Sequence, residues 1–267
     1  MDSNLATIAL RALQQARLQG INTSWVAGSL VENLGNSSSD VDIFVAVHDE
    51  LRHDSVTRLG KDHGVLAFIS EGIRFDIELW TLSQIRALIG KTSSIPINDP
   101  KRNNLHTLEY WESEFVHRLL TGVPLCEIEN FAQLHNAVDR STFVRYLFDT
   151  AVRRADDAFD DTIGMQRANQ LPMACIRAME AVEFSIDCFL HSNNITNDKT
   201  KFRLRKLELL GAKVPDALSI IEKYWSYRRF IPNEGPQQES YIAELLRFSS
   251  ELVEGAQKKF RNLMQVD

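Results

Sequence analysis

The sequence predicts an α+β protein in which a mixed sheet flanked by helices is followed by an α-helical bundle. Short apolar runs bounded by Gly, Ser and Asn fill the first half of the chain, as expected for strands. Longer segments with apolar residues at helical spacing fill the second half. The change of pattern places the domain boundary at 128/129, which gives domains of residues 1–128 and 129–267.

The first half alternates between the two kinds of element. Its patterns predict strands over 21–27, 40–47, 64–70 and 73–80, and helices over 4–19, 30–34, 49–62, 82–89 and 108–120. Glu71-Gly72 separates the last two strands and predicts a hairpin. Residues 91–106 contain two prolines and several Ser and Asn, and this long loop is expected to cover or line a site.

The second half is helical throughout. The spacing predicts helices over 141–159, 173–190, 199–210, 215–227 and 238–264. Pro172 suits the first turn of the second of these helices, because proline has no N–H to leave unpaired there.

Composition excludes several classes of protein. The 267 residues are 44% hydrophobic, and the formal net charge of −6 disfavours broad binding to nucleic acid. Three widely spaced cysteines without a Cys-x-x-Cys motif predict free thiols in a reducing cytoplasm. Neither a signal peptide nor a membrane-spanning run is apparent, so the predicted location is cytoplasmic and no membrane partner is expected.

Asp40 and Asp42 stand at the start of the strand predicted over 40–47. Successive side chains of a strand point to opposite faces, so the two carboxylates share one face, about 6–7 Å apart. At that separation each raises the cost of ionising the other. Mg²⁺ removes this cost, because it takes one or two carboxylates and leaves its other positions to water and phosphates. The alternative is that Asp40 only caps the preceding polar loop.

Gly28 and Ser29 follow the first predicted strand. Glycine lets a phosphate approach the backbone closely. The N–H groups at the start of the short helix predicted over 30–34, with the positive end of its dipole, would hold the anion. An anion cradle beside a pair of carboxylates predicts a site for a nucleoside triphosphate with Mg²⁺.

The order of these motifs resembles the signature of the polymerase-beta-like nucleotidyltransferases. Gly28-Ser29 is followed, after ten residues, by an Asp-x-Asp motif at Asp40 and Asp42. Members of that superfamily carry a third carboxylate within an apolar strand nearby, which Asp76 matches. The resemblance covers roughly the first half of the chain. The superfamily includes antibiotic-modifying enzymes, minimal nucleotidyltransferases of toxin–antitoxin systems and nucleic-acid-tailing enzymes.

The resemblance implies roles for particular residues. Asp40, Asp42 and Asp76 would be the catalytic carboxylates and would hold two Mg²⁺ ions, with Glu78 as an alternative third carboxylate. Asp76 would also take the proton of the attacking hydroxyl.

Four further residues are predicted to bind the triphosphate: Gly28, Ser29, Ser39 and Lys201. For Ser39 the alternative is a flexible polar loop. Lys201 belongs to a run of cations over 199–206, and a solvated helix face is the default interpretation of such a run. The aromatic segment 224–230 is either core or a wall on which a ring substrate stacks.

The function implied by the resemblance is transfer of a nucleoside monophosphate. AMP would pass from ATP to a hydroxyl of a small molecule such as an aminoglycoside-like antibiotic, and pyrophosphate would leave. Three alternatives stay open: nucleotidylation of a protein by an antitoxin-type enzyme, formation of a nucleic-acid or oligonucleotide product, and a catalytically silent nucleotide-binding module. The expected partners are a nucleoside triphosphate and the hydroxylated acceptor, with a homodimer left open.

Overall fold

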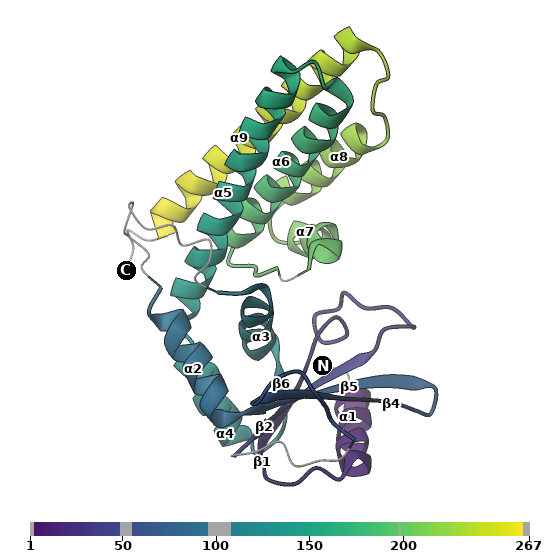
Figure 1. Ribbon diagram of the computed structural model, residues 1–267, viewed down its shortest axis with the longest axis vertical. Helices are drawn as coiled ribbons and strands as arrows, with labels where there is room; N and C mark the ends of the chain where they lie inside the picture. Colours follow the sequence, from purple (N-terminus) through teal and green to yellow (C-terminus); the bar gives the residue numbers. More distant parts are fainter. Residues whose placement is uncertain (1–2, 49–54, 96–107, 198, 264–267) are drawn as a thin grey trace. The chain divides into compact units, whose positions relative to one another are not determined.

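The chain consists of a sheet unit and a helical unit, which confirms the α+β class. The computed structural model describes residues 3–48, 55–95, 108–197 and 199–263. Its two units are Met1–Phe143 and Val144–Asp267 (Figure 1). The elements of the first unit, in chain order, are α1 Ser3–Ala16, β1 Ile21–Ala27, β2 Val41–Val47, β3 Thr57–Arg58, β4 His63–Ser70, β5 Ile73–Thr81, α2 Leu82–Ser93, α3 Tyr110–Thr121, β6 Val123–Cys126 and α4 Ile128–Ala137.

The first unit is built on a six-stranded mixed sheet with strand order β3-β4-β5-β2-β1-β6. β2 and β5 run parallel at the centre of the sheet, and the other neighbours pair antiparallel. The predicted β4–β5 hairpin is confirmed. Its turn residues Glu71 and Gly72 have positive φ angles of 52° and 78°, as in the type I′ turn that matches the twist of paired strands.

The two faces of this sheet carry different side chains. On one face, Ala12 of α1 packs in a buried apolar cluster with Ile43 of β2. On the other, Trp25 stacks on Phe44 at 5.5 Å between ring centroids and meets Phe115 of α3 edge-on. Asp42 alternates with Ile43, so it shares the Phe44 face. The predicted site therefore opens on the aromatic face.

Three local predictions in this unit are wrong. Residues 30–33 form a turn rather than a helix, and the only described regular structure within 49–62 is the short strand β3. The helix predicted over 82–89 instead continues to Ser93, into the first residues of the predicted loop over 91–106. Residues 49–54 of the predicted helix and 96–106 of the predicted long loop lie outside the described residues.

Two elements escaped prediction, and they place the division between the units after the expected boundary at 128/129. β6 pairs with β1 at the edge of the sheet, where Pro124 is tolerated because an edge strand has a free side. α4 packs on the same strand: Phe131 contacts Trp25 at 5.7 Å between ring centroids, and Asn130 donates to the Asn22 carbonyl. The first unit accordingly extends to Phe143.

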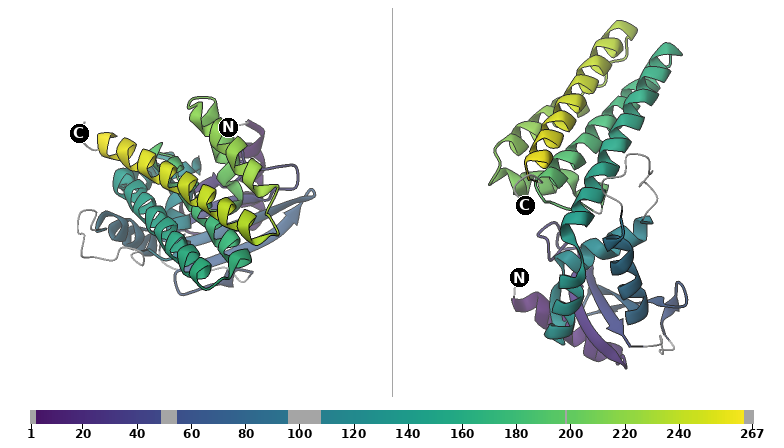
Figure 2. Two further views of the ribbon diagram at one scale, coloured as in Figure 1. Left: turned by 90° about the horizontal axis from the view of Figure 1, so that it is seen from above. Right: turned by 90° about the vertical axis from the view of Figure 1, so that its left-hand side faces the viewer.

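The second unit is formed by long helices (Figure 2). Its elements are α5 Arg140–Arg167, which begins in the first unit, α6 Leu171–Ser192, the 3₁₀ turn η2 Thr200–Phe202, α7 Arg203–Gly211, α8 Asp216–Arg228 and α9 Gly235–Leu263. α6 and α9 pack along their lengths, with Met179 and Ile242 fully or almost fully buried. Ser249 of α9 donates to the Ala181 carbonyl of α6 at 3.1 Å, which requires close backbones.

The cation run over 199–206 is not uniformly solvated. Arg203 is buried and donates to Asp187 at 2.7 Å and to Glu183 at 2.9 Å. Lys206 is also buried and donates to the Thr196 carbonyl. Buried cations need such partners, since an unpaired one costs several kcal/mol. The default interpretation of this run is therefore wrong for these two residues.

The aromatic segment 224–230 divides between the two interpretations. Tyr224 is buried and its hydroxyl donates to Glu183 at 3.0 Å. Trp225 and Phe230 are exposed. The core interpretation is therefore confirmed for Tyr224, and stacking of a ring substrate on the exposed pair stays a prediction.

The three cysteines are all free thiols. Cys175 and Cys188 are buried free thiols, and Cys126 is a half-buried one. Burial raises the pKa of the Cys175 and Cys188 thiols, so neither is a reactive thiolate near neutral pH.

Across the described ranges, every helix falls short of the length and apolarity that crossing a bilayer demands.

Candidate active site

Sheet topology brings the three predicted carboxylates together. β2 and β5 are parallel neighbours whose register sets Asp42 directly opposite Asp76. Asp40 immediately precedes β2. One carboxylate oxygen from each of the three residues lies within 4.8 Å of the others. The juxtaposition that the sequence predicted for Asp40, Asp42 and Asp76 is therefore present.

The donor set fits a hard divalent cation. All three donors are carboxylates, which Mg²⁺ prefers to nitrogen or sulfur ligands. Each of the three residues is half-buried, so the oxygens are held by the sheet and still open on one side. Such a set leaves coordination positions for water and for the phosphates of a substrate.

Asp42 carries the strongest electrostatic perturbation at this site. Burial raises its pKa from an ordinary value of 3.8 to about 7. Arg118 opposes this rise, whereas the negative charges of Asp40, Glu78 and Asp76 add to it. Like charges crowded at a half-buried position are costly unless a cation is present, which agrees with a metal-binding role.

Arg118 of α3 is a site residue that sequence analysis missed. It is buried, with Nη1 at 3.8 Å from Asp42 Oδ2 and Nη2 at 3.5 Å from Glu114 Oε1. A signal was present in the sequence, because Arg118 follows Phe115 by three residues and therefore lies on an apolar helix face. A cation on such a face needs a buried carboxylate nearby.

We expect Arg118→Met to strengthen Mn²⁺ binding at pH 9 by roughly tenfold, equivalent to about one pKa unit. The guanidinium lies 3.8 Å from Asp42 and opposes the rise of its pKa, and for the same reason it disfavours a divalent cation at that carboxylate. The gain should narrow at pH 7, because loss of the neighbouring cation raises the pKa of Asp42 further and the protonated carboxyl is a poor metal ligand. Calorimetric titration at both pH values measures this, and Arg118→Lys, which keeps the charge, should bind Mn²⁺ like the unchanged protein. Equal affinities of Arg118→Met and the unchanged protein at pH 9 would contradict the electrostatic role given to Arg118.

Gly28 lies beside Asp42 because β1 ends where β2 begins. The antiparallel register sets Ala27 opposite Asp42, and Gly28 follows with φ at +91°. A Cβ on Gly28 would lie 2.0 Å from Asp42 Oδ2 and 2.9 Å from Arg118 Nη1. Glycine is required here to make room for this carboxylate and guanidinium. Its predicted contact with a phosphate is a separate matter, which stays a prediction.

The segment after Gly28 is a tight turn. The Ser29 carbonyl accepts from the N–H groups of Leu34 and Gly35 at 2.8 and 2.9 Å. Buried His117 of α3 contacts Glu32 through Nε2 and Oε1 at 3.0 Å, which ties the turn to α3. The predicted helix dipole is absent, so an anion would meet the backbone of a turn instead.

The loop before β2 is ordered by its own polar groups. The Ser39 hydroxyl accepts from the Asn36 N–H at 2.9 Å, and the Ser39 N–H donates to the Asn36 carbonyl. Asn36 in turn accepts from the Ser38 N–H through its side chain. These bonds favour a fixed loop next to Asp40. The phosphate contacts of Ser29 and Ser39 stay predictions.

Asp76, and not Glu78, completes the carboxylate group. Glu78 instead accepts from Trp80 Nε1 at 3.2 Å and lies 3.4 Å from His63 Nε2. Asp76 accepts two hydrogen bonds from Arg74, through Nε and Nη2, both at 3.0 Å. Arg74 therefore occupies both oxygens of one predicted metal ligand.

Arg74→Ala is expected to strengthen Mn²⁺ binding a few-fold, as for loss of an exposed ion pair. The guanidinium competes with a metal for the Asp76 oxygens, and its removal leaves them free. Calorimetric titration measures the change. Arg86→Ala, at an exposed position of α2, alters the net charge equally and should have little effect. Weaker binding by Arg74→Ala than by Arg86→Ala would contradict this competition.

Lys201 belongs to the second unit. Its ammonium lies over the ring of Phe202, 4.8 Å from the centroid, and the residue is exposed. Its side chain is therefore accessible to an anion. Contact with a triphosphate stays a prediction.

Comparison with known proteins yields similarity to solved structures alone. No family model matches the sequence, and no curated protein matches it. Among solved structures, a nucleotidyltransferase-like protein from Exiguobacterium sibiricum 255-15 is similar, with a TM-score of 0.47 and 14% identity. The alignment covers 98% of this chain and 79% of that chain. The site described above rests on the geometry of this chain's own residues.

Proposed function

We propose that the protein is a Mg²⁺-dependent nucleotidyltransferase that moves AMP from ATP to a hydroxyl of a small molecule such as an aminoglycoside-like antibiotic. One observation carries the proposal: carboxylates from two adjacent parallel strands converge, within 4.8 Å of one another, beside the turn that begins at Gly28. Carboxylate clusters of this kind suit a metal-bound triphosphate.

Each residue then has a defined task. Asp40 and Asp42 would hold Mg²⁺ from one strand and Asp76 from the next. When bound there, Mg²⁺ supplies positive charge to the triphosphate and to the departing pyrophosphate. The acceptor oxygen forms a bond to the α-phosphorus, the bond from that phosphorus to the bridging oxygen breaks, and the hydroxyl proton passes to an Asp76 oxygen.

The surroundings of the carboxylates favour a cationic acceptor. Glu78 lies two residues beyond Asp76 on the same strand face, and Glu114 contacts the guanidinium that also approaches Asp42. Acidic groups therefore outnumber the described cations around Asp42, which are Arg74 and Arg118. An amine-bearing acceptor would be attracted to this surface.

The test is a transfer assay with α-labelled nucleoside triphosphates. The protein is incubated with Mg²⁺, each of the four triphosphates in turn and a set of aminoglycosides, and pyrophosphate and labelled product are measured. We expect ATP to support both in the unchanged protein and neither in Asp76→Asn. Label on a protein or in a polynucleotide would overturn the proposed acceptor. Absence of pyrophosphate and of Mg²⁺-dependent nucleotide binding would overturn the enzymatic proposal.

A further inference from the structure

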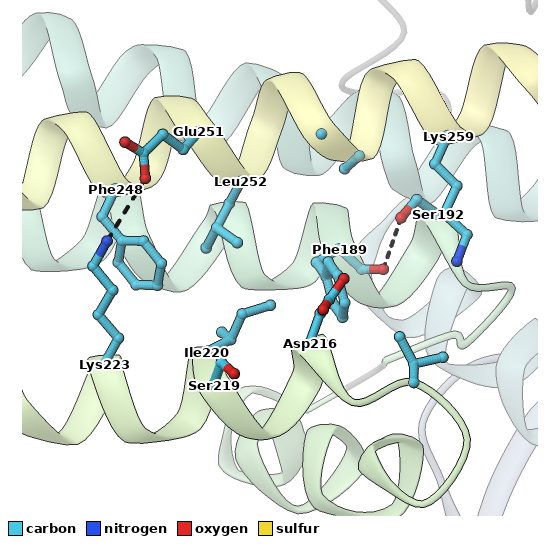
Figure 3. A pocket seen from close by; sticks show the side chains of 13 residues that line it. Phe189, Ser192, Asp216, Ser219, Ile220, Lys223, Phe248, Glu251, Leu252 and Lys259 are labelled. Carbon is cyan, nitrogen blue, oxygen red and sulfur yellow. Dashed lines mark hydrogen bonds and ion pairs between the residues drawn. The ribbon is translucent and has the colours of Figure 1, made fainter.

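The helical unit contains a pocket to which the proposed transfer assigns no role. It lies between α6, α8 and α9, is open to solvent on one side, and has a volume of about 380 Å³ (Figure 3). This volume falls within the range of small-molecule sites, roughly 300–1,000 Å³. Every lining residue lies between Phe189 and Lys259, so the pocket belongs wholly to the second unit.

The middle of the pocket is apolar. Phe189 of α6, Ile220 of α8 and Leu252 of α9 line it and belong to, or pack against, the main core of this unit. Gly255 continues the α9 wall, and a Cβ placed there would meet nothing within 4 Å. Space over an apolar floor favours a ligand with an apolar body.

One end of the pocket is lined by an exposed ion pair. Lys223 of α8 lies 3.6 Å from Glu251 of α9, and its ammonium stands over the Phe248 ring at 4.2 Å from the centroid. Figure 3 shows this group at one end of the pocket. Lys223 and Glu251 neutralise each other, so this end does not require a charged ligand group. The apolar body of a ligand can therefore point towards it.

The other end carries two exposed charged residues that have no ion-pair partner among the residues that the structure describes. Asp216, at the start of α8, has neither an ion-pair nor a hydrogen-bond partner within the described part of the chain. Lys259, on α9, donates to a neutral group, the Asn193 side-chain oxygen. Figure 3 places these residues on opposite walls, away from the Lys223–Glu251 end. An anion and a cation on facing walls are complementary to a zwitterion.

We propose that this pocket binds an α-amino acid with a large apolar side chain. The ligand's ammonium contacts Asp216, its carboxylate contacts Lys259, and its side chain lies on Phe189, Ile220 and Leu252. The proposal uses only the helical unit and is independent of the transfer reaction.

Three compounds of similar shape distinguish the contributions of the ligand's two charges to affinity. L-Phenylalanine carries both, phenethylamine carries only the ammonium and 3-phenylpropionate only the carboxylate. In calorimetric titrations of the full chain we expect L-phenylalanine to bind at least about tenfold more tightly than either of the others, because each charge-assisted hydrogen bond contributes that order of affinity.

Substitutions then locate the site. Gly255→Leu fills the pocket from α9 and should abolish binding, whereas Gly164→Leu, at a helix glycine with equally open space outside the lining, should not change it. Asp216→Asn should reduce the affinity for L-phenylalanine to that of 3-phenylpropionate. The Asp216 variant keeps the test decisive if Gly255→Leu does not fold.

Three results would overturn the proposal. The first is equal binding of the three compounds, and the second is no binding of L-phenylalanine at millimolar concentration. The third is binding that survives both Gly255→Leu and Asp216→Asn. None of these results depends on nucleotide transfer, so failure here leaves the proposed enzyme untouched.

Discussion

Asp42→Asn is expected to stabilise the metal-free protein at pH 8 while abolishing the proposed nucleotidyl transfer. Burial raises the pKa of Asp42 from 3.8 to about 7 in the folded chain. Between these values the folded state holds a proton that the unfolded state has lost, so the free energy of unfolding falls as pH rises from about 4 to about 7. Roughly three pKa units correspond to about 4 kcal/mol above pH 7. Asparagine stays neutral and avoids this cost.

Urea unfolding in the presence of a chelator measures the effect. The advantage of Asp42→Asn should reach a few kcal/mol at pH 8 and vanish near pH 4. Asp139→Ala is a control of opposite sign, because hydrogen bonds from Thr142 and Ser141 lower the pKa of Asp139. That substitution should cost about 1 kcal/mol at pH 8, as for loss of a helix cap. If Asp42→Asn is no more stable than the unchanged protein at pH 8, ionising Asp42 in the folded chain does not carry the cost assigned to it.

Gly28→Ala is expected to disrupt the candidate metal site. The new Cβ would lie 2.0 Å from Asp42 Oδ2, so either the carboxylate or the end of β1 must move. A backbone φ of +91° is also unfavourable for alanine, because a residue with a side chain loses about 1–3 kcal/mol of stability in that conformation. We expect Mn²⁺ affinity to fall roughly 10–100-fold, the range seen when a group that positions a metal ligand is lost.

Gly20→Ala is a control that separates the clash with Asp42 from the backbone cost of a positive φ. Gly20 also has a positive φ, +68°, yet a Cβ there meets nothing within 4 Å. Its substitution should cost only the backbone term, about 1 kcal/mol, and leave Mn²⁺ affinity unchanged. Calorimetric titration and thermal unfolding of the two variants test this. A Gly28→Ala protein that binds Mn²⁺ like Gly20→Ala would remove the argument that Gly28 makes room for Asp42.

The carboxylate cluster was predictable because strand geometry is periodic. Alternation along β2 placed Asp42 away from Ile43, and the apolar pattern around Asp76 marked a second strand. The choice between Asp76 and Glu78 needed the β2–β5 register, which sets Asp76 opposite Asp42. Register between strands far apart in the chain depends on tertiary packing, which local pattern does not contain.

The missed features depend on contacts distant in sequence. α4 and β6 are held by the sheet, since Phe131 packs on Trp25 and Cys126 accepts from the Thr23 hydroxyl through its carbonyl. The turn after Gly28 is held by His117, eighty-five residues beyond Glu32. Buried Arg203 looked solvated because its acidic partners lie on another helix. Where such distant contacts determine the structure, they outweigh the local propensity of the sequence for helix or strand.

The strand order has a consequence for how the protein opens. β3 and β6 form the two edges of the sheet, whereas β5 and β2 lie at its middle. Amide hydrogens at edges exchange with solvent through small local fluctuations, and central strands exchange only when larger parts unfold. The segments bearing Asp42 and Asp76 should thus be among the slowest-exchanging in the first unit, so that the cluster persists through partial opening of the sheet.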